Sequence, residues 1–129
     1  MGRSDRLSAH PGLGRRAEDL AAALLEGAGL RIVARNWRRP EGELDLVADD
    51  GGTCVFVEVR SRTGDEQGHA LESITAHKRA HVIRAARLYL AEVPTNAAAF
   101  RFDVVAVTFD PAGRAEPVIE HIANAFEVS

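Results

Sequence analysis

Two acidic residues and one arginine, Asp45, Glu58 and Arg60, lie within two apolar segments that alternate with a period of two residues. Such alternation is typical of β-strands. The Asp-Asp-Gly-Gly sequence at 49–52, between the segments, predicts a hairpin turn. Charged groups in a half-buried sheet are costly unless they are paired or bound to a metal. Pairing of the strands across the turn would bring the two carboxylates together on one face, where they would repel each other.

A divalent cation would offset this repulsion. A site made only of carboxylate oxygens suits Mg2+ or Mn2+. Arg60 follows Glu58 by two positions and therefore falls on the same face of its strand. A metal ion that activates water, next to a cation that stabilises a pentacovalent phosphorane, is an arrangement that hydrolyses phosphodiesters.

The alternation also assigns the apolar side chains to faces. In the first segment Leu44, Leu46 and Ala48 are expected to share one face. In the second segment Val55 and Val57 are expected to face away from Glu58. The acidic side chains would then point to the face opposite these residues.

Composition indicates a globular protein without a membrane segment. The chain has 129 residues, of which 46% are hydrophobic and 27% charged, enough for one domain with its own core. No apolar run approaches the length of a membrane span. The single cysteine, Cys54, cannot form an internal disulfide, which fits a reduced cytoplasm. We expect a cytoplasmic protein.

The net charge of -3 does not suggest a nucleic-acid-binding protein, but the order of the charges does. Residues 1–40 contain eight arginines and four carboxylates, residues 41–59 six carboxylates and no base, and residues 60–87 six bases and three carboxylates. An acidic centre between basic segments suits a metal site with phosphate-binding margins. The alternative is that arginine is simply the solubilising cation of this chain.

The remaining pattern predicts the elements that hold these residues. Residues 1–13 are expected to form a flexible arm, and residues 14–129 a single domain. Helices are predicted at 15–28 and at 76–93, the second with Thr75 as its N-cap. Strands are predicted at 30–37, 43–48, 53–60 and 100–109, with a polar loop at 61–73. The tail at 118–126 fits a strand or a short helix.

These residues resemble a known nuclease motif. The pattern of Asp45 followed by Glu58-x-Arg60 is similar to the PD-(D/E)XK motif of the restriction-endonuclease-like superfamily. Further stretches resemble the YraN-like uncharacterised protein family within it: Gly14-Arg15-Arg16-Ala17-Glu18, Ala34-Arg35-Asn36-Trp37-Arg38, Gly42-Glu43-Leu44-Asp45-Leu46, Val55-Phe56-Val57-Glu58-Val59-Arg60-Ser61-Arg62, Lys78-Arg79, Ala85-Ala86-Arg87-Leu88-Tyr89-Leu90 and Phe102-Asp103-Val104-Val105-Ala106. The resemblance covers roughly residues 12–110.

The resemblance implies both a fold and a function. The fold is α/β, with an αβββαβ core in which helices flank a mixed central sheet. The function is a nuclease dependent on Mg2+ or Mn2+. By analogy with Holliday-junction resolvases its substrate would be branched or single-stranded DNA, and it would act as a homodimer.

The chain departs from the motif at Arg60, where the superfamily usually has lysine. Arginine stays protonated and cannot act as a base, but it can hold a phosphate and offset transition-state charge. Lys78 is the only lysine of the chain and begins the second predicted helix. It could reach back to the acidic pair as a displaced lysine, or it could be an ordinary solvated residue.

Three other acidic residues have more than one reading. By resemblance, Glu18 is the first-helix glutamate that completes the acidic site and joins the metal ligands; alternatively it is a surface residue favoured by the helix dipole. Glu43 could contact the metal or pair with Arg60 or Arg62. Asp103 has no partner evident from the sequence, and we expect it to be structural.

Basic residues on both predicted helices and after Glu58 are the expected contacts to nucleic acid. A solvated, locally paired helix face is the alternative for those of the second helix. The set is Arg15, Arg16, Arg62, Lys78, Arg79, Arg84 and Arg87.

Three hypotheses therefore stand. The chain is a metal-dependent DNA nuclease, or a nucleic-acid-binding module that has kept the fold and lost the chemistry, or a protein partner in DNA processing that does not contact DNA. Arg60 is the best support for the second hypothesis.

Overall fold

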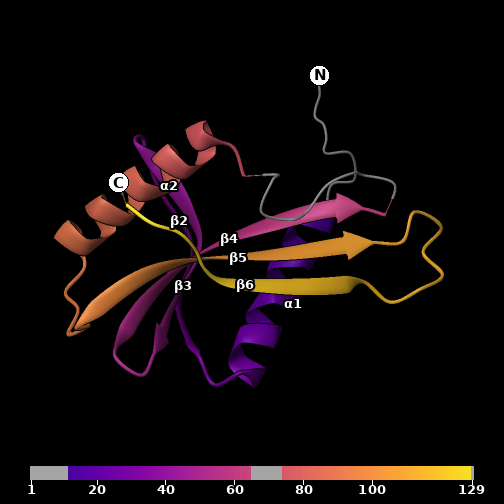
Figure 1. Cartoon of the computed structure of the whole chain (residues 1–129), viewed down its shortest axis with the longest axis horizontal. Coiled ribbons are helices and arrows are strands. Elements are labelled where there is room, and N and C mark those ends of the chain that lie inside the picture. The colour runs from indigo at the N-terminus through magenta and orange to yellow at the C-terminus, as the bar shows by residue number, and fades with distance from the viewer. Residues whose placement is uncertain (1–11, 65–73, 129) are drawn as a thin grey trace.

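A five-stranded sheet with one helix against each face forms the centre of the molecule (Figure 1). The structure is a computed structural model and describes residues 12–64 and 74–128. Its elements, in chain order, are α1 (Leu13–Gly27), β2 (Arg31–Arg39), β3 (Gly42–Asp50), β4 (Thr53–Thr63), α2 (Ala76–Glu92), β5 (Ala99–Phe109) and β6 (Val118–Phe126).

The sheet is mixed, with strand order β2-β3-β4-β5-β6. β4 and β5 pair in parallel, and the other three neighbouring pairs are antiparallel. Two parallel strands need a crossover connection, and α2 lies within the one between β4 and β5. The α/β fold with a mixed sheet flanked by helices is therefore as predicted, and it agrees with an αβββαβ core.

Each face of the sheet has its own apolar core. α1 contributes Ala17, Ala21 and Leu25, at helical spacing, to a cluster that includes Val55 and Val57 of β4. On the other face α2 packs through Val82, Ala85, Ala86 and Tyr89 onto a cluster that includes Leu44, Phe56, Phe102 and Val104. Small alanines on both helices allow them to lie close to the sheet.

The ends of several elements differ from the predicted ones. α1 begins at Leu13, which the sequence assigned to the flexible arm; the rest of that arm, residues 1–11, lies outside the described residues. β4 extends to Thr63, into the predicted polar loop, of which residues 65–73 also lie outside the described residues. The tail at 118–126 is a strand. Thr75 caps α2 as predicted, its Oγ1 accepting from the N–H of Lys78 at 3.1 Å.

The predicted face of Leu44 is wrong. Leu44 packs with the α2-side cluster, whereas Leu46 and Ala48 pack with the α1-side cluster. β2 changes face at the same level, because Ala34 and Trp37 both pack on the α2 side although three positions separate them.

The cause is a local break in regular strand geometry. Asn36 has a left-handed backbone, with φ of 51°, which asparagine tolerates better than most residues. Arg35 pairs with Leu46 and Trp37 with Leu44, so Asn36 lies opposite Asp45. Strict alternation fails there, and this irregularity turns Asp45 toward β4.

Candidate active site

Asp45 and Glu58 converge where β3 and β4 separate. The two strands pair from Asp50↔Thr53 to Leu46↔Val57, one residue short of the two acids. Beyond it the N–H of Val59 donates to Asp45 Oδ2 at 2.8 Å. The Asp45 carboxylate thus takes a backbone donor of β4, and this contact holds it beside the Glu58 side chain.

Glu58 is buried, Asp45 is half-buried, and the two carboxyl groups are close enough to affect each other. Glu58 is only 3% exposed. Burial first, and then the negative charge of Glu58, raise the pKa of Asp45 well above its usual value, although the hydrogen bond from Val59 opposes the shift. The charge of Glu18 adds a smaller rise in the same pKa. The pair therefore carries more negative charge than the protein around it neutralises.

Lys78 reaches the pair from α2. Its Nζ lies 3.2 Å from Glu58 Oε2, and its side chain remains about half exposed. The displaced-lysine arrangement raised from the sequence is thus present in space: the only lysine of the chain touches the buried glutamate.

Gly42 allows α2 to come this close. A Cβ atom at Gly42 would lie 2.8 Å from the carbonyl oxygen of His81 and 3.2 Å from the Cβ of Ala85. Both distances are shorter than ordinary contacts, so a side chain here would push the helix off β3. The glycine therefore helps to set the position of Lys78 against Glu58.

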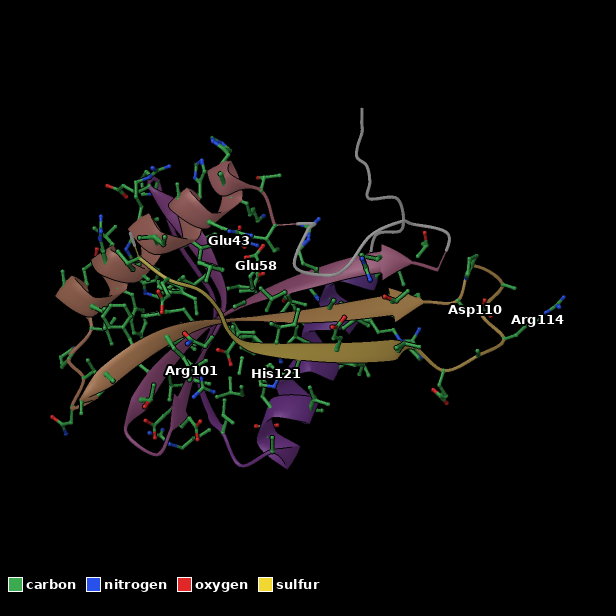
Figure 2. The ribbon with its side chains drawn as sticks, viewed as in Figure 1. Glu43, Glu58, Arg101, Asp110, Arg114 and His121 are labelled. Atoms are coloured by element: carbon green, nitrogen blue, oxygen red, sulfur yellow. The ribbon has the colours of Figure 1, made fainter. Side chains whose placement is uncertain are left out.

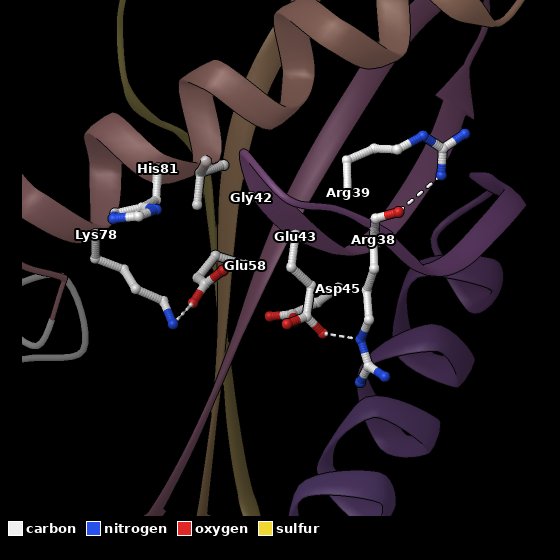
Figure 3. Close-up of a pocket in the computed structure, with 9 residues that line it drawn as sticks. Arg38, Arg39, Gly42, Glu43, Asp45, Glu58, Lys78 and His81 are labelled. Carbon is white, nitrogen blue, oxygen red and sulfur yellow. Dashed lines mark hydrogen bonds and ion pairs between the residues drawn. The ribbon is translucent and has the colours of Figure 1, made fainter.

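A pocket of about 430 Å³ opens onto the acidic pair (Figure 3). Figure 3 shows the side chains of Glu43, Asp45 and Glu58 directed into it from β3 and β4, with Lys78 and His81 on the α2 side. Its lining residues are Arg38, Arg39, Gly42, Glu43, Asp45, Glu58, Lys78, His81 and Val82. The pocket therefore combines acidic side chains on the sheet with basic ones at its margins.

Glu43 and Glu18 each have a partner at the edge of this pocket. Glu43 Oε2 accepts from Arg38 Nε at 3.0 Å, so Glu43 has a pairing role with a partner that the sequence analysis did not consider. Glu18 Oε1 accepts from Asn36 Nδ2 at 3.0 Å. Since Asn36 lies opposite Asp45, this bond keeps Glu18 near the acidic pair without placing it in the pocket lining.

The available ligands suit Mg2+ or Mn2+, which need only one or two protein carboxylates, better than an ion whose ligands all come from the protein. Within residues 12–64 and 74–128, no three histidine, cysteine, aspartate or glutamate side chains form a ready metal cage. Asp45 and Glu58 offer oxygen ligands beside an open pocket. Mg2+ is usually held by one or two carboxylates, with water and substrate phosphate completing its shell.

Arg60 is not among the residues that line the pocket. It follows Glu58 on β4 and is half-buried. Lys78, from α2, is a cation that contacts Glu58.

The predicted phosphate contacts are divided among several surfaces. Arg15 is exposed on α1, Arg16 Cζ lies 5.1 Å from the centre of the Phe109 ring, and Arg62 Nη2 lies 3.5 Å from Thr108 Oγ1. On α2, Lys78 points into the acidic pocket, but its neighbours Arg79, Arg84 and Arg87 line a different hollow. The basic residues of α2 that were expected to contact nucleic acid therefore lie on two surfaces.

Asp103 has the partners that the sequence did not reveal. It is fully buried, and Arg101 donates to it through Nε at 3.0 Å and Nη2 at 3.3 Å. His121 Nε2 lies 2.8 Å from its Oδ2, and the N–H of Asn124 donates to its Oδ1 at 2.9 Å. Arg101 and His121 are labelled in Figure 2, away from Glu43 and Glu58. The network ties β5 to β6 and supports the expected structural role.

In the described part of the chain, no helix has the length and apolar character needed to cross a membrane.

Comparison with known proteins gives one consistent family. The model of uncharacterised protein family UPF0102 matches residues 17–107. A UPF0102 protein of Pelotomaculum thermopropionicum is 50% identical over 114 residues, covering 88% of this chain and 94% of the relative. A UPF0102 protein of Frankia casuarinae is 45% identical over 121 residues, covering 93% and 100%, and one of Ectopseudomonas mendocina is 45% identical over 122 residues, covering 94% and 99%.

Proposed function

Because this chain belongs to the uncharacterised protein family UPF0102, the YraN-like family expected from its motifs, we propose its function from the geometry of its acidic pocket. The protein is a nuclease that depends on Mg2+ or Mn2+ and hydrolyses DNA phosphodiesters. The observation that carries this proposal is the convergence of Asp45 on the buried Glu58, with the Lys78 ammonium 3.2 Å from Glu58.

Asp45 and Glu58 would hold the divalent cation. When bound, such a cation supplies Lewis-acid activation of the phosphodiester and of water. The hydrogen bond from Val59 fixes one Asp45 oxygen, so the carboxylate is positioned before any ligand arrives. Glu18, held by Asn36, adds negative charge from the side and would join the ligands only by leaving that amide.

Lys78 supplies the positive charge that the motif usually has on the strand. An ammonium group is a compact point charge on a flexible stem, suited to a phosphate oxygen or to an attacking water molecule. Lys78 lies at the pocket mouth and can contact both the acidic pair and a bound phosphate. Arg60 would act electrostatically, as a phosphate-binding guanidinium on β4.

The arginines at the pocket margin would bind the DNA backbone on either side of the cleaved bond. Arg38 and Arg39 line the pocket from β2, and each also pairs with a carboxylate, Glu43 and Glu92 respectively. These exposed pairs are weak and can exchange for phosphate at little cost. The acidic centre and basic rim together favour a phosphodiester substrate.

Arg60 favours one alternative: a nucleic-acid-binding module without catalysis. If Lys78 does not replace the strand lysine functionally, the fold would bind DNA and leave it intact. In that case removing the acidic charges would preserve DNA binding or strengthen it.

One experiment separates the two functions. Labelled single-stranded, duplex and four-way-junction DNA are incubated with the protein in Mn2+, Mg2+ or EDTA. Wild type is compared with Asp45→Ala and Glu58→Ala, and with Glu26→Gln as a control that removes an exposed carboxylate outside the pocket lining. Binding is measured on the same samples in EDTA.

The nuclease proposal predicts cleavage that needs the metal, falls at least about 100-fold in both pocket variants and is unchanged in Glu26→Gln. Binding without cleavage in any metal, equal in wild type and the pocket variants, would favour the binding module instead. Absence of both would leave the third hypothesis, a partner protein that does not contact DNA.

A further inference from the structure

A second hollow lies on the other side of α2 from the acidic pocket. It is a groove of about 540 Å³ between α2 and the residues that end and follow β6. The chain after β6 runs back along α2, as Figure 1 shows. We call this the α2–β6 groove. Its lining includes Arg79, Ile83, Arg84, Arg87, Phe126 and Glu127.

The groove and the acidic pocket use different faces of the same helix. Lys78, His81 and Val82 line the acidic pocket. Arg79, Ile83 and Arg87 are spaced by four residues, so they form one row along α2, and this row faces the groove. The consecutive residues Lys78 and Arg79 thus line different hollows.

The arginines that line the groove have no ion-pair partner among residues 12–64 and 74–128. Arg31, Arg35, Arg38, Arg39 and Arg101, on β2 and β5, each form an ion pair with a carboxylate. Among the residues that the structure describes, Arg79, Arg84 and Arg87 have no such pair. Counting only the described residues, three guanidinium groups therefore face a groove lined by one side-chain carboxylate, that of Glu127.

The guanidinium of Arg79 packs against an aromatic ring. Its Cζ lies 5.7 Å from the centre of the Phe126 ring, and its Nε is buried without an acceptor within the described ranges. The ring packs the guanidinium but leaves its charge uncompensated. An anionic ligand in the groove would supply the missing charge.

We propose that the α2–β6 groove binds a second segment of nucleic-acid backbone, so that α2 lies between two backbone segments of one substrate. The proposal rests on the proposed function, because the first segment is the one at the acidic pocket. It narrows the substrate class to DNA with two backbones, duplex or branched, rather than a lone single strand.

The dimensions agree with this substrate. An α-helix with its side chains is about 10–12 Å across. The two backbones that border the major groove of duplex DNA are separated by about 12 Å. A helix with cationic side chains on both flanks can therefore reach both strands, whereas a short single strand can occupy only one flank at a time.

The test is a binding measurement in EDTA, where cleavage does not interfere. Affinities of the full chain for a 30-nucleotide single strand, the matching duplex and a four-way junction are measured as a function of salt. Wild type is compared with the double variant Arg84→Ala/Arg87→Ala. The matched control is Arg31→Ala/Arg35→Ala, which removes the same charge from ion-paired positions on β2, and circular dichroism verifies that all three fold.

We expect the groove variant to lose affinity for duplex and junction DNA but not for single-stranded DNA. The groove variant binds duplex and junction at least about 10-fold more weakly, and its salt slope falls by about two, since each lost phosphate contact contributes about 0.9. Its affinity for the single strand, and the affinity of the control for every substrate, change less than about threefold.

Three results would overturn the proposal: equal losses for single-stranded and duplex DNA, no loss for duplex DNA, or competition by polyglutamate as effective as that by duplex DNA. The last would make the groove an acidic-peptide surface. Failure of the proposed nuclease is distinguishable, because cleavage in Mn2+ could be absent while this selective binding persists.

Discussion

Two aspartates of the same sheet, Asp45 and Asp103, lie in similar backbone surroundings. They differ in whether neighbouring groups compensate the negative charge of the carboxylate. Each lies next to an asparagine of the neighbouring strand that has a left-handed backbone: Asn36 opposite Asp45, and Asn124 donating its N–H to Asp103. At both asparagines, therefore, the backbone departs from regular strand geometry.

The difference lies in what surrounds each carboxylate. Asp103 receives donors from Arg101, His121 and Asn124, so its charge is fully paired although it is completely buried. Asp45 receives one backbone N–H and faces another carboxylate. A buried charge that is paired holds strands together, whereas an unbalanced one destabilises the fold unless a ligand completes it. The predictions below test this contrast, from the largest effect to the smallest.

The largest effect is expected when the paired site is broken. Asp103→Ala leaves Arg101 and His121 without their common acceptor and should lower the free energy of unfolding by about 3–5 kcal/mol. Asp19→Ala, which removes the partner of the exposed Arg35, should cost less than about 1 kcal/mol. Urea denaturation at pH 7 measures both. Similar losses in the two variants would contradict the contrast.

At Asp45, removal of the carboxylate charge should raise the free energy of unfolding, whereas at Asp103 it should lower it. Asp45→Asn keeps the shape of the side chain and removes its repulsion with Glu58. We expect the metal-free protein to gain about 0.5–2 kcal/mol of stability, as is common when a charge is removed from a functional site. Urea denaturation in EDTA measures the gain. A loss of stability would show that the acidic pair is balanced in the metal-free state.

The pH dependence of this gain is also fixed in sign. The pKa of Asp45 is higher in the folded chain than its usual value of 3.8. The contribution of Asp45 to the stability of the folded state is therefore favourable at low pH and is lost as pH rises through the raised pKa. The advantage of Asp45→Asn over wild type should therefore grow as pH increases from about 4 toward neutrality. Parallel stability curves for the two proteins would rule out the raised pKa.

The smallest effect on stability is expected at Lys78. Its side chain is about half exposed, so Lys78→Met should change the free energy of unfolding by less than about 1 kcal/mol despite its contact with Glu58. Cleavage, by contrast, should fall by about 10–100-fold, as expected when a positioned charge is lost. Undiminished cleavage would make Lys78 an ordinary solvated residue and return the catalytic cation to Arg60.

Much of this fold could be predicted from alternation and turn signals, which identified the hairpin of β3 and β4 and the convergence of its two acids. The face of Leu44 could not, because the backbone of Asn36 interrupts the period of two. Arg101 could have been paired with Asp103, since residues two apart share a strand face, but His121 lies in a tail whose pattern fitted both strand and helix. The contact between Lys78 and Glu58 could not be predicted either, because it depends on how closely α2 approaches β3. Gly42 allows this close approach, and the sequence pattern alone does not reveal that tertiary contact.

The most direct test of the central claim is thermal unfolding with and without 10 mM Mn2+, for wild type, Asp45→Asn and the control Glu26→Gln. A ligand that binds only the folded state raises its stability, by about 1.4 kcal/mol at tenfold excess over the dissociation constant. If the acidic pair is a divalent-cation site, Mn2+ raises the melting temperature of wild type and control by several degrees and leaves that of Asp45→Asn unchanged. An equal rise in all three proteins, or none in wild type, would contradict it.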